Sequence, residues 1–477
     1  MSRYRSWGLR PRLQLRARIV VCVLFAFVCS VTHAAQQAIA SAHPLATRAG
    51  EEILDQGGNA FDAAVAVAAA LAVVEPYASG LGGGGFFLLR RGSDDLRVMI
   101  DAREAAPGRA APQMYLDESG KQKGRLSLDG ALASGIPGTP AAIAWLTEKY
   151  GTLPLSRTLA PAIKLARDGF DVDARYVSAA GFRESLLKSD PAVAAVFLDS
   201  GAVPKVGFHI RQPALAATLE TLAARGREGF YGGEIARRLV AGVKAAGGIW
   251  EAEDLARYRV IERKPQQFAY RSAHLTCASL PSSGGLVLAE ALQILERFPL
   301  PELSRVDRDH LVVEAWRRGY QDRSRYMGDP DFVSAPPMLA DADYAARRAE
   351  SIRLDVATSS ESLDARYPPI AQGDNTTHFS IVDAHGNWVA ATLSVNLPFG
   401  AGVLAGDTGV LLNDEMNDFS IGGDAPNAYR LTGGAANAVA PGKRPLSSMT
   451  PTFVEDERGT LVLGTPGGSR IISMVAL

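Results

Sequence analysis

The stretch from Ala60 to Val74 constrains the fold of this chain more than any other part of the sequence. It reads AFDAAVAVAAALAVV, and Asn59 stands before it as a suitable N-cap. This composition predicts a helix with apolar side chains on every face, and such a helix is buried on all sides. Other helices or sheets must therefore pack around this segment.

A run of glycines, residues 80–85 (GLGGGG), follows this helix and leads into a predicted strand at residues 86–90. A phosphate-binding loop is disfavoured, because the glycines of a P-loop open a helix and are followed by Lys and Ser or Thr. Here the glycines end a helix and open a strand. This arrangement indicates a tight turn at which backbone segments approach closely.

Helical patterns dominate the first part of the chain, and alternating patterns typical of strands dominate the part after Pro369. This order favours an α+β fold of stacked layers over a doubly wound parallel sheet. A β-hairpin is expected to begin directly at the Thr376-Thr377 pair. The expected helices span residues 45–55, 284–298 and 309–326, and the expected strands span residues 377–383, 388–396, 409–413, 450–455 and 460–463.

The N-terminal segment has the features of a secretory signal. Arginines without any acidic residue precede an apolar run from Ile19 to Val31, and the small residues Ala34 and Ala35 suit signal-peptidase cleavage. An uncleaved membrane anchor is the alternative, but the run is short for a hydrocarbon layer of about 30 Å at about 1.5 Å per residue. We predict that residues 1–34 are removed and that the protein is periplasmic or secreted, without a stable membrane span.

The remaining composition narrows the class of protein. Removal of residues 1–34 takes six positive charges from a formal net charge of −1 and leaves −7. No basic stripe remains, which argues against a nucleic-acid partner. Of the three cysteines only Cys277 lies outside the predicted signal, so we expect no internal disulfide; this suits a bacterial periplasm. Cys277 is predicted to be a packed strand residue, not a nucleophile.

Common catalytic signatures are absent from the sequence. It contains no Gly-x-Ser-x-Gly elbow, no His-Glu-x-x-His, no Cys-x-x-Cys and no paired-glycine dinucleotide fingerprint. The histidines are scattered, and the odd spacing of His378 and His385 on a predicted hairpin directs them to opposite faces. We therefore predict neither a metal ion nor a cofactor.

The segment GDNTTH, residues 373–378, offers a different chemistry at the start of the predicted hairpin. A threonine hydroxyl is a weak nucleophile unless a base lies beside it. When threonine is the first residue of a chain, its own α-amine, with an ordinary pKa of about 7.7–8.0, can be that base. The alternative is an ordinary strand that begins with two threonines, which composition alone favours.

Motifs along nearly the whole mature chain resemble the γ-glutamyltransferase (glutathione hydrolase) family of N-terminal-nucleophile hydrolases. Each motif is weak alone, but together they stand in the order typical of the family. The most specific are residues 375–378 (NTTH), 413–420 (NDEMNDFS), 444–449 (RPLSSM) and 466–470 (PGGSR), supported by residues 40–47, 57–64, 74–76, 80–85, 101–104, 281–285, 320–324 and 328–330.

This resemblance implies a four-layer αββα sandwich and self-cleavage between Asn375 and Thr376. Residues 35–375 would form a large subunit and residues 376–477 a small one, and the two would remain together as a heterodimer. The chain ends at Leu477, before the usual end of the family. We therefore expect the small subunit to be C-terminally truncated.

The resemblance also assigns roles to single residues. Thr376 would be the nucleophile, Ser394 would support it, and the backbone of Gly467 and Gly468 would form the oxyanion hole. The residues expected to bind the glutamyl group are Arg103, Ser447 and Ser448 at its α-carboxylate, Asn396, Glu415 and Asp418 at its α-ammonium, and Tyr429 from a lid at residues 421–443.

The implied activity is transfer of the γ-glutamyl group of glutathione and related amides to water, amino acids or peptides, through an ester on Thr376. Two alternatives remain open. One is a related acylase or an enzyme that processes poly-γ-glutamate. The other is an uncleaved, non-catalytic periplasmic protein that only binds γ-glutamyl compounds.

Overall fold

The segment predicted to be buried on all sides is helix α3 (Ala60–Val74), and all of its side chains are buried. Asn59 and Asp62 form a capping box at its first turn, so the helix begins where the sequence predicts. Helix α2 (Pro44–Asp55) packs beside it. The computed structural model describes residues 37–363, 376–421, 427–431 and 433–477; the predicted signal, residues 1–34, lies outside them.

A six-stranded antiparallel sheet lies against α3. Its strand order is β1-β9-β10-β2-β3-β6. The predicted hairpin is confirmed as β9 and β10, which occupy the middle of this sheet. The strands are β1 (Ala38–Ser41), β2 (Gly84–Arg91), β3 (Leu96–Ala102), β6 (Ile261–Arg263), β9 (Thr376–Val382) and β10 (Trp388–Ser394).

A second antiparallel sheet of four strands has the order β12-β11-β8-β7. The predicted pair near the end of the chain is confirmed as β11 and β12. Cys277 lies buried in β8, where burial raises the pKa of its thiol to about 12, in agreement with a packing role. The strands are β7 (Gln266–Tyr270), β8 (Ala273–Cys277), β11 (Thr452–Asp456) and β12 (Gly459–Leu463).

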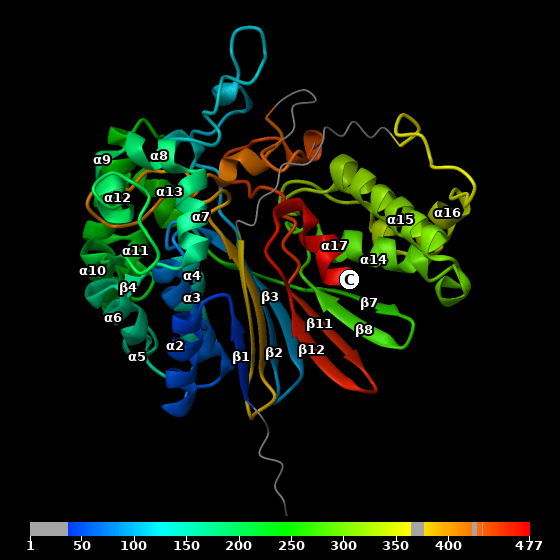
Figure 1. Ribbon diagram of the computed structural model, residues 1–477, viewed down its shortest axis with the longest axis horizontal. Helices are drawn as coiled ribbons and strands as arrows, with labels where there is room; N and C mark the ends of the chain where they lie inside the picture. Colours follow the sequence, from blue (N-terminus) through cyan, green and yellow to red (C-terminus); the bar gives the residue numbers. More distant parts are fainter. Residues whose placement is uncertain (1–36, 364–375, 422–426, 432) are drawn as a thin grey trace, which may run out of the picture. The chain divides into compact units, whose positions relative to one another are not determined.

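The side chains of β2 show how the layers are stacked. Phe87 and Leu89 pack against α3, whereas Phe86 and Leu88 belong to an apolar cluster that also contains Phe453 of β11. Successive strand residues point to opposite faces, so this sheet is covered by helices on one face and by the second sheet on the other. Helix α14 (Gly284–Leu295) packs on the outer face of the second sheet. The result is the predicted four-layer αββα sandwich (Figure 1).

The helices fall into two groups, one on each outer side of the stacked sheets (Figure 1). The small sheet of β4 (Phe170–Asp171) and β5 (His209–Ile210) lies among the first group. With α2 and α3, that group contains α4 (Thr139–Lys149), α5 (Leu155–Thr158), α6 (Ala160–Asp168), α7 (Ala174–Phe182), α8 (Glu184–Ser189), α9 (Pro191–Phe197), α10 (Pro213–Arg225), α11 (Glu228–Tyr231), α12 (Gly233–Ala245) and α13 (Ala252–Arg257). The second group contains α14 (Gly284–Leu295), α15 (Arg305–Tyr326), α16 (Ala342–Glu350) and α17 (Ile471–Ala476).

Some sequence-based boundaries were wrong. Residues 409–413 form no strand; a single bridge joins Leu411 to Leu404 within a buried loop. The apolar run there reflects burial, which a loop and a strand can share. Helix α14 ends at Leu295, before the predicted Phe298, and α15 begins at Arg305, where Ser304 caps it.

Within the described residues no helix is long and apolar enough to cross a membrane.

Segments on either side of Thr376 are interleaved in both sheets. Strands β9 and β10, which follow position 375, lie between β1 and β2, and β11 pairs with β8. Residues 37–477 form one compact unit by their internal contacts. A break between residues 375 and 376 would therefore leave both parts joined by shared sheets and a shared core.

Candidate active site

Thr376 is the first residue of β9, and it is 6% exposed. Ser394, the last residue of β10, lies directly opposite it in the sheet. Residues opposite each other in an antiparallel pair share one face, so the two hydroxyl-bearing side chains are neighbours. The Ser394 hydroxyl also accepts a hydrogen bond of 2.9 Å from the backbone N–H of Asn396.

Glycines make room on the other side of Ser394, which pairs with Gly84 of β2. A Cβ on Gly84 would collide with the Ala102 carbonyl and the Glu104 carboxyl group, and one on Gly83 would collide with the Ser394 carbonyl. The glycine run therefore allows close backbone approach beside Thr376, as the sequence predicts.

Thr376 lies at the junction of two hollows of very different size. The smaller hollow, named the closed pocket because most side chains around it are buried, has a volume of about 20 Å³. Among the predicted site residues that the structure describes, all but Gly467 line it. An open cavity of about 850 Å³ lies on the other side, with Glu75, Arg175 and Phe182 in its wall. The described residues that line the closed pocket are Arg103, Arg323, Thr376, Ser394, Asn396, Glu415, Asp418, Tyr429, Leu431, Ser447, Ser448, Met449, Gly468, Ser469 and Ile471.

Arg103 occupies the centre of a buried acidic cluster. Its Nη1 lies 2.8 Å from Oε2 of Glu415 and 3.5 Å from Oε2 of Glu104, and its Nη2 donates to Asp418. Its Nε donates to the Pro445 carbonyl at 3.2 Å. Burial alone would lower the pKa of the guanidinium, but the carboxylates of Glu415, Asp418 and Glu104 together raise it above its ordinary value.

The acids of this cluster lie in an environment that disfavours their charged form. Burial raises the pKa of Glu104 to about 7, against the lowering effect of Arg103. Burial likewise raises the pKa of Glu415 well above its ordinary value and that of Asp414 to about 8. One guanidinium therefore does not satisfy all the acids around it.

Several buried acceptor atoms in this region have no hydrogen-bond donor among the residues that the structure describes. They are Oδ1 of Asn396, both carboxyl oxygens of Glu415 and both of Glu104. Glu415 and Arg103 are close enough to form an ion pair. The geometry of this pair is not that of a hydrogen bond, so both carboxyl oxygens of Glu415 lack a donor among the described residues. Asn396 is held in place, because its Nδ2 donates to the Asp414 carbonyl at 2.9 Å. Buried acceptors without donors indicate a place for a ligand that brings N–H groups.

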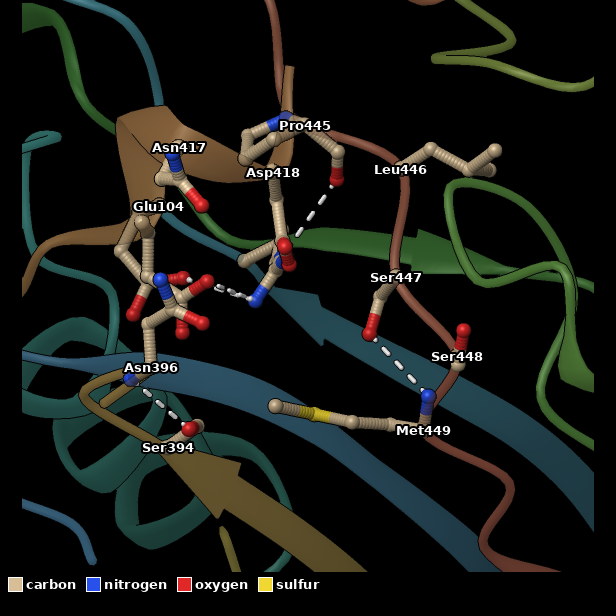
Figure 2. Close-up of polar contacts among 12 residues, drawn as sticks. Glu104, Ser394, Asn396, Asn417, Asp418, Pro445, Leu446, Ser447, Ser448 and Met449 are labelled. Atoms are coloured by element: carbon tan, nitrogen blue, oxygen red, sulfur yellow. Dashed lines mark hydrogen bonds and ion pairs between the residues drawn. The ribbon is translucent and has the colours of Figure 1, made fainter. Parts of the chain in front are cut away.

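Ser447 and Ser448 line the same pocket, and Figure 2 shows them on a segment separate from Ser394 and Asn396. This segment is fixed by the loop before α14. The backbone N–H of Ser447 donates to the Pro281 carbonyl at 2.8 Å, and the Ser283 hydroxyl donates to the Ser447 carbonyl at 2.7 Å. The Ser447 hydroxyl accepts from the N–H of Met449 at 3.1 Å.

Gly467 and Gly468 begin the short helix η7 (Gly468–Arg470), and both have positive φ angles, 136° and 57°. Gly468 lines the closed pocket, whereas Pro466, two residues earlier, lines the open cavity. A Cβ on Gly468 would collide with the ring of Tyr429, whose hydroxyl donates to the Asn396 carbonyl at 2.9 Å. Tyr429 thus connects the predicted lid to the pocket.

Two parts of the predicted site lie outside the described residues: Asn375, and residues 422–426 and 432 of the lid. The sequence analysis did not single out two residues of this region: Arg323, which lines the closed pocket, and Glu104, which lies beside Arg103. Glu104 and Arg323 both stand in family-like motifs, residues 101–104 and 320–324, and their position in those motifs was the available signal.

Among the described residues, no group of three or more His, Cys, Asp or Glu side chains is arranged to hold a metal ion.

Comparison with known proteins identifies relatives over most of the chain. A family model described as Gamma-glutamyltranspeptidase matches residues 46–477. The glutathione hydrolase proenzyme of Pseudomonas sp. (strain A14) is 44% identical over 480 residues, which cover 97% of this chain and 82% of that protein.

Solved structures share the fold. Cephalosporin acylase from Bacillus halodurans superposes with a TM-score of 0.76 at 30% identity, covering 91% of this chain and 78% of that one. Helicobacter pylori gamma-glutamyltranspeptidase superposes with a TM-score of 0.66 at 39% identity, covering 69% of this chain and 94% of that one. These likenesses confirm the predicted N-terminal-nucleophile hydrolase fold.

Proposed function

The chain belongs to the gamma-glutamyltranspeptidase family, and from that premise we propose that it transfers γ-glutamyl groups to water or amines through an ester on Thr376. Glutathione is the proposed donor, since relatives are named glutathione hydrolase proenzymes. The supporting observation is the set of buried acceptors without donors beside Arg103. An α-ammonium brings three N–H donors and a positive charge to these atoms.

Maturation comes first in this proposal. The Thr376 hydroxyl attacks the carbonyl carbon of Asn375, the peptide nitrogen leaves as the α-amine of Thr376, and water hydrolyses the ester. The interleaved strands support the persistence of the two resulting chains, residues 35–375 and 376–477, as one heterodimer. Export to the periplasm or medium is supported by the arginine-rich, apolar N-terminus.

Substrate binding exchanges contacts inside the closed pocket. The α-ammonium takes the position beside Glu415, Asp418 and Asn396, which releases the Arg103 guanidinium to pair with the α-carboxylate. A planar guanidinium suits a carboxylate because it donates two parallel hydrogen bonds. The hydroxyls of Ser447 and Ser448 complete the carboxylate site.

In the chemical step the free α-amine of Thr376 accepts the proton of the Thr376 hydroxyl, whose oxygen attacks the γ-carbonyl of the donor. Ser394 holds the nucleophile from the facing strand. The N–H groups of Gly467 and Gly468 stabilise the oxyanion, and one such donor contributes roughly 3–4 kcal/mol. The amine then returns the proton to the leaving nitrogen. Water or an acceptor amine enters from the open cavity and releases the glutamyl group.

Denaturing gels and mass spectrometry test this proposal. We expect wild-type protein to give two chains, the smaller beginning at Thr376, and to hydrolyse γ-glutamyl anilide. Thr376→Ala should give one uncleaved chain and lose at least about 10⁴-fold in kcat. Thr376→Ser, which retains a hydroxyl and an α-amine, is the control and should keep part of both activities. Folded wild-type protein that is active with the 375–376 bond intact would contradict the proposal.

A related acylase activity is the second candidate, because the chain resembles cephalosporin acylase in fold and sequence. The choice of substrate distinguishes the acylase from the γ-glutamyltransferase. A glutaryl amide has the carboxylate of a glutamyl amide but no α-ammonium, so it leaves the buried acceptors unsatisfied. We expect γ-glutamyl anilide to exceed glutaryl anilide by at least about 100-fold in kcat/KM. The reverse preference would favour the acylase.

A further inference from the structure

Arg323 is a second arginine of the closed pocket, and it reaches the pocket from the last turn of α15. Its side chain is 4% exposed. Its Nε donates to the Ser283 hydroxyl at 2.9 Å, and its Nη2 donates to the Ser448 hydroxyl at 3.3 Å. One guanidinium thus connects the loop before α14 with a pocket hydroxyl.

Among the described residues, the backbone of the serine segment makes no direct hydrogen bond to Arg323. The N–H and hydroxyl of Ser283 both donate to the Ser447 carbonyl, at 2.9 Å and 2.7 Å, and Ser447 donates to Pro281. Arg323 instead bonds the side-chain oxygen of Ser448. In the part of the chain that the structure describes, this is the one hydrogen bond of that hydroxyl.

We propose that Arg323 is a positioning residue that directs the O–H of Ser448 toward the α-carboxylate of the donor; this inference rests on the proposed function. A guanidinium is always protonated and can only donate, so the Ser448 oxygen must be the acceptor of this bond. The Ser448 proton cannot point back along it. It is therefore available to a group inside the pocket that Ser448 lines.

The charges of the pocket agree with this assignment. The acids Glu415 and Asp418 cluster around Arg103, whereas Arg323 bonds the Ser448 hydroxyl. In Figure 2, Asp418 and Asn396 lie at one part of the site and Ser448 at another. A cation bonded to the Ser448 oxygen polarises this hydroxyl and strengthens its hydrogen bond to an anion. The carboxylate end of the substrate belongs on this side.

Paired substrates test the inference in the full-length, processed enzyme. γ-Glutamyl p-nitroanilide has an α-carboxylate, whereas 4-aminobutyryl p-nitroanilide keeps the amine and lacks the carboxylate. We expect Arg323→Gln to raise KM for the first about 10–100-fold with kcat changed less than about threefold, and to change kcat/KM for the second less than about twofold. Arg323→Lys should recover part of the loss.

A double-mutant cycle examines the connection through Ser448. Ser448→Ala should show the same selective loss, and Arg323→Gln combined with Ser448→Ala should lose no more than about twofold beyond Ser448→Ala alone. Fully additive losses would overturn the inference.

Arg318→Gln is the matched control, because Arg318 is the other fully buried arginine of α15 but bonds Glu314 and Ser351 away from the pocket. It should lower Tm and leave the ratio of the two substrates unchanged. Equal losses on both anilides in Arg323→Gln would overturn the role of Arg323. Wild-type enzyme inactive on every γ-glutamyl donor would instead contradict the proposed function.

Discussion

The two hollows that meet at Thr376 differ in volume and in how deeply their walls are buried. The closed pocket is filled by side chains that are almost wholly buried, such as Arg103, which is 1% exposed, and Glu415. The open cavity has walls with solvent-exposed residues, such as Arg175 and Phe182, the latter 67% exposed. Recognition should therefore differ on the two sides of the nucleophile.

The difference follows from desolvation. A buried charge without a partner is costly, so the closed pocket accepts only a group whose charges and donors match its own. Exposed groups keep their water when a ligand does not match them. Under the proposed function, we therefore expect strict selection of the glutamyl group in the closed pocket and tolerance of the amine or water in the open cavity.

The largest expected effect in this comparison is that of Arg103→Lys. An ammonium cannot reproduce the paired hydrogen bonds of a guanidinium, and it leaves part of the acidic cluster without a partner. We expect KM for γ-glutamyl anilide to rise about 100-fold, with a smaller change in kcat, measured by steady-state kinetics.

Arg97→Lys is the control, because Arg97 lies on β3, which ends just before Arg103, but pairs with Glu455 and lines no part of the closed pocket. Its kinetics should match wild type. Unchanged kinetics in Arg103→Lys would show that Arg103 does not bind the γ-glutamyl donor. The proposed difference in selectivity between the two hollows would then be wrong.

Glu104→Gln tests whether Glu104, beside the closed pocket, titrates as a buried carboxyl group. The quantity measured is the free energy of unfolding at two pH values. Burial raises the pKa of Glu104 from its ordinary 4.5 to about 7, so between these values the folded protein holds a proton that the unfolded chain has lost. This group's contribution to stability therefore declines as pH rises through that window. Glu104→Gln removes the decline, and we expect it to stabilise the protein by about 1–3 kcal/mol more at pH 8 than at pH 5.

Denaturant unfolding at both pH values measures this difference. Glu253→Gln, at an exposed position on α13, is the control and should change stability equally at both. The same gain from Glu104→Gln at pH 5 and pH 8 would show that Glu104 does not titrate as a buried group.

The smallest expected effect is that of Arg175→Ala in the wall of the open cavity. Because Arg175 is exposed and has no carboxylate partner within salt-bridge distance in the described parts of the chain, its loss leaves no buried charge unpaired. We expect kcat/KM for γ-glutamyl anilide to change less than about threefold. A loss of tenfold or more would show that the open side also selects the donor.

Local patterns predicted the elements nearest the nucleophile. The apolar composition of α3, the glycine run and the alternation of β9 and β10 each depend on neighbours within a few residues, so the sequence reveals them. The predicted strand at 409–413 was wrong because its apolar side chains are buried in a loop, and burial alone does not specify extended pairing. The contacts of Arg323 were not predicted, because its partners Ser283 and Ser448 lie far away in the chain.

By itself, the sequence determined the family, the order of helices and strands and the identity of the candidate nucleophile, since these rest on local composition and on motifs in a characteristic order. Only the tertiary structure decided that Arg103 lies among three acids, two of them more than 300 positions later, and that Thr376 divides a closed pocket from an open cavity. The physical reason is that pairing, burial and desolvation depend on distances in space, which residues distant along the chain acquire only when the sheets are assembled.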